Sequence, residues 1–198
     1  MKRQTTMNEP TCTKHPKRRT GPARRLGQVI VICLGAALAT ACGGLDEAAV
    51  TQRAQAALKP LKQDLRKALT DAMGRGPEAA VEVCAVEAPA IARRAARDGV
   101  VVGRTALRLR NPQNAPPSWA AGALAGLDGP RVFDLGEGRA GYLEPIRLEA
   151  LCTTCHGSAV APAILSRIAA LYPADQATGF ATGDLRGAFW AELAPASD

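Results

Sequence analysis

The sequence has 198 residues, of which 47% are hydrophobic and 4% aromatic, and its formal net charge is +7. Residues 1–41 hold eight basic residues and one acidic residue, so they carry the whole excess, and the rest of the chain is formally neutral. The pI of about 9.4 therefore reflects a basic leader and not a nucleic-acid-binding surface, and no nucleic-acid partner is expected.

Residues 1–41 are predicted to be a signal peptide. The basic region is followed by an apolar stretch, residues 26–39, that is too short to span a bilayer comfortably as a permanent helix. The leader is long, so translation can start at Met1 or at Met7.

The end of this leader resembles a bacterial lipobox. Small residues precede a cysteine in Leu38-Ala39-Thr40-Ala41-Cys42, although lipoboxes more often have Leu where this chain has Ala39. The resemblance implies that Cys42 is lipidated and anchors the protein to the periplasmic side of a membrane, and Gly43 after it points to the outer membrane. Ordinary cleavage, which would give a soluble periplasmic protein, is the alternative.

Residues 42–198 have the length of a single domain. An amphipathic helix is expected over residues 46–72, with a kink at Pro60, and a second helix from Pro77 to about Arg97. The apolar residues that recur at helical spacing in the first helix are Val50, Ala54, Ala57, Leu58, Leu61, Leu65 and Leu69.

The second half of the chain is predicted to be richer in strands. The elements expected in order are a strand over 100–102, an extended or turn segment over 105–109, an irregular loop over 111–117, a short helix over 118–126, a hairpin of 131–135 and 140–148, a helix over 162–171 and a strand over 185–193. Helices followed by antiparallel strands predict an α+β domain.

One motif in this half carries recognisable chemistry. Cys152-Thr153-Thr154-Cys155-His156 has the C-x-x-C-H spacing at which two thiols attach covalently to the vinyl groups of one haem c. The histidine that follows is then placed to bind the haem iron from the proximal side.

Two other readings of the motif fit less well. A closed zinc site needs four ligands, and the rest of the chain offers too few paired Cys or His residues. A thioredoxin-like redox pair would open a helix within a βαβ unit, whereas this motif follows the predicted strand that ends near residue 149.

The second axial ligand cannot be another histidine of the folded domain, because the only other histidine, His15, lies in the leader. Beyond the motif and Cys42, residues 42–198 contain one methionine, Met73, and one cysteine, Cys84. Residue chemistry alone leaves both open, since a free cysteine is commonly a small buried hydrophobe. Another weak ligand, water or no ligand at all are further alternatives for the position opposite His156.

Several stretches together resemble a family of PAS-like, single-haem c-type cytochromes long catalogued only as a domain of unknown function. The stretches that carry the resemblance are Val83-Cys84, Val102 to Thr105, Leu107 to Pro112, Tyr142 to Ile146, Leu151 to Gly157, Tyr172 to Gly179 and Gly183 to Phe189. The resemblance implies a PAS-like sheet flanked by helices, one covalent haem c, and axial ligation by His156 and Cys84.

Function follows from this ligation. A thiolate opposite histidine lowers the reduction potential, so we expect a low-potential redox or small-gas sensor that binds a diatomic ligand and signals through a separate protein partner. A periplasmic electron carrier is the alternative. Enzymatic activity is not expected, because the motifs contain no second histidine or paired carboxylates for acid–base work.

Overall fold

The computed structural model describes residues 44–97 and 99–195. The helices are α1 (Glu47–Met73), α2 (Pro77–Ala95), α3 (Ser118–Ala121), α4 (Thr153–His156) and α5 (Pro162–Leu171), and the strands are β1 (Val100–Thr105), β2 (Arg131–Asp134), β3 (Ala140–Arg147) and β4 (Leu185–Leu193). Two single 3-10 turns, η1 (Pro112–Asn114) and η2 (Ala150–Cys152), precede α3 and α4. The predicted α+β class is confirmed.

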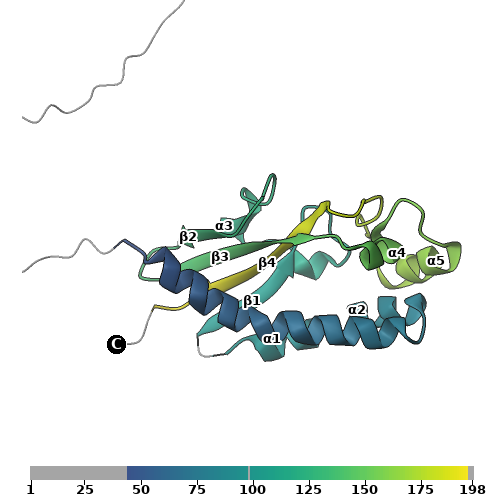
Figure 1. Ribbon diagram of the computed structural model, residues 1–198, viewed down its shortest axis with the longest axis horizontal. Coiled ribbons are helices and arrows are strands. Elements are labelled where there is room, and N and C mark those ends of the chain that lie inside the picture. The colour runs from purple at the N-terminus through teal and green to yellow at the C-terminus, as the bar shows by residue number, and fades with distance from the viewer. Residues whose placement is uncertain (1–43, 98, 196–198) are drawn as a thin grey trace, which may run out of the picture. The chain divides into compact units, whose positions relative to one another are not determined.

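The strands form one antiparallel sheet in the order β1-β4-β3-β2 (Figure 1). β2 and β3 are a hairpin, and β4 lies between β3 and β1, with Leu193 opposite both Ala140 and Val100. The last strand of the chain is therefore an interior strand, and it connects the hairpin to the strand that follows the helices.

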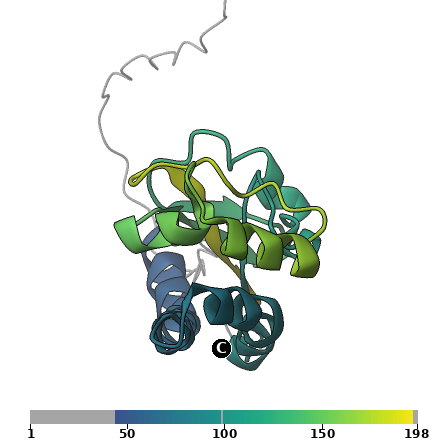
Figure 2. The ribbon, with the colours of Figure 1, turned by 90° about the vertical axis from the view of Figure 1, so that its right-hand side faces the viewer.

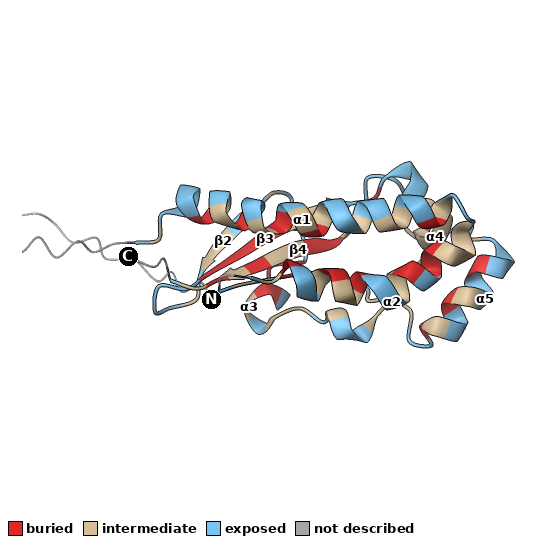
Figure 3. Ribbon diagram, turned by 90° about the horizontal axis from the view of Figure 1, so that it is seen from below, coloured by how far each residue is buried: buried red, intermediate tan, exposed pale blue. Residues whose placement is uncertain are grey.

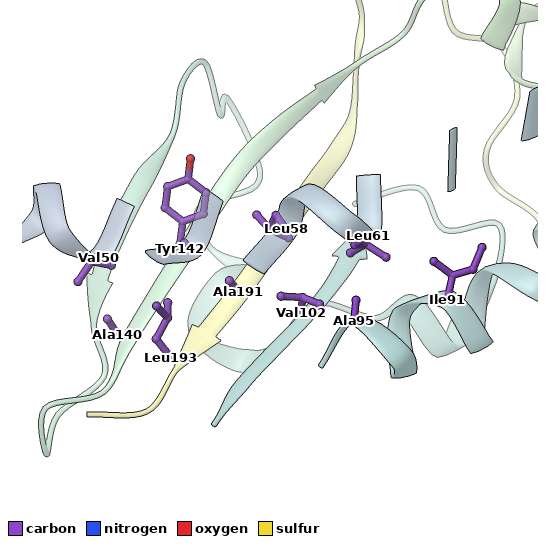
Figure 4. Close-up of a cluster of buried hydrophobic side chains, with 11 residues drawn as sticks. Val50, Leu58, Leu61, Ile91, Ala95, Val102, Ala140, Tyr142, Ala191 and Leu193 are labelled. Carbon is purple, nitrogen blue, oxygen red and sulfur yellow. The ribbon is translucent and has the colours of Figure 1, made fainter. Parts of the chain in front are cut away.

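The two long helices run along one face of this sheet (Figure 1). Asp46 caps α1 by accepting hydrogen bonds from the backbone N–H groups of Ala48 and Ala49. The buried faces of both helices point toward the sheet, as the red bands in Figure 3 show. The main core comprises Val50, Ala54, Leu58, Leu61, Ile91, Ala95, Val102, Ala140, Tyr142, Ala191 and Leu193 (Figure 4).

The C-terminal part of α1 and the N-terminal part of α2 extend beyond the sheet, and α4 and α5 pack there (Figures 1 and 2). Val81 of α2 packs against Ile164 and Ile168 of α5 and against Tyr172. On its other side α2 packs on α1 through Ala80, Val83 and Ala72. This end of the domain is thus a four-helix environment in which the C-x-x-C-H segment is placed.

Three details differ from the expectations. The helix expected over 118–126 ends at Ala121, because Gly122 and the turn after it stop the hydrogen-bond ladder, and its N-cap is Pro117. The loop over 111–117 contains the 3-10 turn η1, which Asn111 caps through its side chain. The first strand continues beyond Val102 to Thr105. Among the described helices, none is long and apolar enough to cross a membrane.

Candidate functional site

A cavity of about 480 Å³ lies where the extended helices meet the sheet and α4. Its volume falls within the range of roughly 300–1,000 Å³ typical of small-molecule and cofactor sites. One stripe of α2 lines it at helical spacing through Ala80, Cys84, Ala88 and Ile91, and the facing stripe of α1 does so through Leu65, Leu69 and Met73. The helical walls are largely apolar, as a porphyrin requires.

All three chemically active residues of the motif line this cavity, namely Cys152, Cys155 and His156. Cys152 ends the turn η2, and Cys155 and His156 lie in the single turn of α4. Both thiols are free and partly exposed. Burial raises the pKa of the Cys155 thiol, while the Arg110 cation opposes that shift. Among residues 44–97 and 99–195, no three His, Cys, Asp or Glu side chains form a cluster that can hold a bare metal ion.

The imidazole of His156 is oriented by the backbone. Its Nδ1 lies 2.7 Å from the carbonyl oxygen of Ala177, and because a carbonyl only accepts, Nδ1 carries the proton and Nε2 keeps a free lone pair. Burial lowers the pKa of His156 to about 3, and the cations of Arg110 and Arg186 contribute to the shift. The ring is therefore neutral near pH 7, which is the state that binds a metal.

The buried side chain of Arg110 stabilises the position of His156 and of the carbonyl that orients it. Its guanidinium pairs with Asp175, with 3.0 Å between Nε and Oδ1, and both side chains are about nine-tenths buried. The Nη2 group of Arg110 also donates to the carbonyl oxygens of Cys155, at 2.6 Å, and Ala177, at 3.2 Å. One side chain thus fixes both α4 and the carbonyl that orients His156.

The segment after α5 docks directly onto the motif. The backbone N–H of Phe180 donates to the carbonyl oxygen of His156 and that of Gly179 to Gly157, which gives a parallel bridge between Gly157 and Phe180. A Cβ atom at Gly157 would lie 2.5 Å from the carbonyl oxygen of Thr153. Only glycine fits at this position, so the residue after the motif histidine is fixed by backbone packing.

Cys84 and Met73 both line the cavity, so the structure brings each distal candidate to the same space as His156. Cys84 lies on α2 directly after Val83 and three residues after Val81, and both valines are buried. Val86, two residues further along α2, is 73% exposed and does not contribute to the buried surroundings of Cys84. Tyr172 lines the cavity near Cys84, and burial raises its pKa to about 12, so its hydroxyl stays protonated.

The sequence stretches around Arg110 and Asp175 contribute only to the family resemblance, and sequence reasoning gives neither residue a role. The same holds for Arg104 and Arg186, which also line the cavity. An arginine and an aspartate 65 positions apart give no local signal that they pair. The leader and Cys42 lie outside the described residues.

Comparison with known proteins gives two matches. The model of the Tll0287-like family (Tll0287) matches residues 45–193. Among solved structures, the crystal structure of the cyanobacterial heme-protein Tll0287 is similar, with 27% sequence identity, a TM-score of 0.55, and coverage of 77% of this chain and 97% of that one. No curated protein matched the chain.

Replacing Arg110 with methionine should destabilise the fold severely, because Asp175 would lose its ion pair and the carbonyl oxygens of Cys155 and Ala177 would each lose a donor. Breaking a buried ion pair by removing one partner costs about 3–5 kcal/mol. Chemical denaturation followed by circular dichroism measures the free energy of unfolding.

The matched control is Arg66→Met, which removes an ion pair with Glu149 whose side chains are 72% and 59% exposed. This variant should unfold close to the wild type, because exposed pairs contribute little. Equal losses in the two variants would contradict the structural role given to Arg110.

Proposed function

Because this chain belongs to the Tll0287-like family, we propose that it is a haem-binding, cytochrome-like protein that carries one covalent haem c. The observation that carries the proposal is that Cys152, Cys155 and His156 line a single apolar-walled cavity. The similar crystal structure is that of a heme-protein, which supports the same assignment. The sheet and its flanking helices would then form a PAS-like haem domain.

The residues present fit a haem. Cys152 and Cys155 would form the thioether bonds, and His156 would bind the iron through Nε2 while its Nδ1–H stays on the Ala177 carbonyl. When bound, haem supplies one-electron redox chemistry and an iron site for small ligands. Arg110 keeps the histidine and its supporting carbonyl in register.

Cys84 is the proposed distal ligand. It lies mid-helix on α2, and the α2 residues on either side of it, Val81 and Ala85, pack in the same cluster as Cys155. Its position also matches the axial cysteine implied by the family resemblance. An anionic sulfur stabilises ferric over ferrous iron, so Cys84 would hold the iron of a bound haem more weakly when that iron is reduced. The thiolate is thus the residue that would respond to a change of redox state.

This response favours a low-potential redox or small-gas sensor in which loss of Cys84 admits a diatomic ligand. The second candidate is an electron carrier that keeps both axial ligands in both oxidation states. In either role the protein acts on a separate redox or signalling partner and not as an enzyme. We propose that it is exported and anchored through a lipid on Cys42, with a soluble periplasmic form as the alternative.

The wild-type protein should retain haem in a denaturing gel stained for haem, because thioether bonds survive denaturation. Cys152→Ser and Cys155→Ser variants should each lose much of the stain, and the double variant all of it. A wild type matured in a host that attaches haem c, yet unstained in the gel, would refute covalent attachment.

Substituting Cys84 with alanine should convert a low-spin ferric haem into a high-spin or water-ligated one, whereas Met73→Leu should leave the spectrum unchanged. Electron paramagnetic resonance of the ferric protein distinguishes these states. If the Met73 variant changes and the Cys84 variant does not, Met73 is the ligand and the case for a low potential is lost.

The same samples separate sensor from carrier. The reduced wild type should bind CO or NO rapidly, and Cys84→Ala should bind at least as fast because its distal position is open. A reduced wild type that binds neither gas, beside a variant that does, would assign the protein to the carrier class.

Lipidation of Cys42 predicts that a labelled fatty acid is incorporated into the wild type and not into Cys42→Ala. Labelling that persists in the variant would overturn the anchor, and absence of labelling in both proteins would support the soluble form.

A further inference from the structure

The cavity is lined by more cationic side chains than the carboxylates of the described residues neutralise. The cationic residues that line it are Lys62, Arg66, Arg104, Arg110, Arg147 and Arg186. Four of them form ion pairs, and these are Lys62 with Glu144, Arg66 with Glu149, Arg110 with Asp175 and Arg147 with Asp128. Within residues 44–97 and 99–195, Arg104 and Arg186 have no carboxylate partner.

The side chain of Arg186 is partly buried. Burial lowers its pKa to about 10, and the neighbouring cations of Arg110 and Arg104 add to the shift. Its Nη1 donates to the carbonyl oxygen of Arg108 at 3.0 Å, and this is its one side-chain hydrogen bond in the described part of the chain. A guanidinium has five N–H donors, so most of its capacity remains for a ligand.

Arg104 lies near the end of β1, opposite Phe189 of β4, and its side chain is only partly exposed. In the part of the chain that the structure describes, its guanidinium forms no hydrogen bond. Unpaired charges at partly buried positions are costly unless an anion compensates them. The cavity therefore suits a largely apolar group that carries about two negative charges.

We propose that Arg104 and Arg186 bind the two propionate carboxylates of the haem. The inference rests on the proposed function, and it adds the orientation of the group within the cavity. Cys152 and Cys155 fix the vinyl substituents, and the two arginines fix the propionates. Guanidinium groups suit carboxylates because they donate two parallel hydrogen bonds to the two oxygens. The other four cations are already neutralised by their own partners.

The test uses the haem-loaded wild type and the variants Arg104→Gln, Arg186→Gln and the double variant. Arg147→Gln is the matched control, because Arg147 lines the same cavity but is paired with Asp128. Haem staining of denaturing gels comes first. An unstained wild type would overturn covalent attachment and the proposed function, whereas stained variants allow the propionate contacts to be tested separately.

The midpoint potential should fall in each single variant and further in the double variant, because removing a cation near the haem favours the ferric state. The resonance Raman bands of the propionates should shift in the same variants. In Arg147→Gln the Raman bands should stay at the wild-type value, and the potential should change less than in the other single variants, because Arg147 is already paired with Asp128. Unchanged potentials and Raman bands in stained Arg104→Gln and Arg186→Gln proteins would overturn the proposal.

If the glutamine variants do not fold or do not acquire haem, the variants Arg104→Lys and Arg186→Lys replace them in the test. Each keeps its charge but loses the paired donors, so the propionate bands should shift while the potential changes less than on neutralisation. Propionate bands identical to those of the wild type in both lysine variants would also overturn the assignment.

Discussion

The guanidinium of Arg110 reaches two parts of the chain that the fold has to bring together, α4 and the segment after α5. It pairs with Asp175 after α5, and it donates to the carbonyl of Cys155 in α4 and to that of Ala177, which orients His156. An ion pair removed from water is stable only when its remaining hydrogen-bonding groups are satisfied. Here those groups are backbone carbonyls of the site itself, so the electrostatic requirement of one side chain sets the orientation of His156.

Local patterns predicted much of this fold. The helix over residues 162–171 and the strand over 185–193 were predicted with the bounds that α5 and β4 have, because periodicity and flanking turn residues are local signals. The helix over 118–126 was predicted too long, since a single turn followed by Gly122 lacks a periodic pattern. Strand order was not predicted, because pairing of β4 with both β3 and β1 depends on contacts far apart in sequence.

The candidate site, like the fold, could be predicted from the sequence only in part. Cys152, Cys155 and His156 follow one another within five residues, so their chemistry can be recognised from the amino-acid sequence alone. The charges around them cannot be recognised in that way. Counting residues makes the chain after the leader neutral, yet the structure gathers cations on one cavity wall and leaves Arg104 and Arg186 without carboxylate partners among the described residues. Net charge is a sum over all residues of the chain, whereas a binding site depends on where individual charges lie in the fold.

The interior position of β4 also sets an order of events during synthesis. The sheet cannot be completed until residues 185–193 are available to enter between β1 and β3. Phe180 and Ala177, which close over His156, likewise follow the motif in the chain. The two thiols therefore emerge while the groove around them is still open. If haem c is attached as proposed, the thiols would be accessible to the attaching enzyme during that interval, before the last strand completes the sheet beside them.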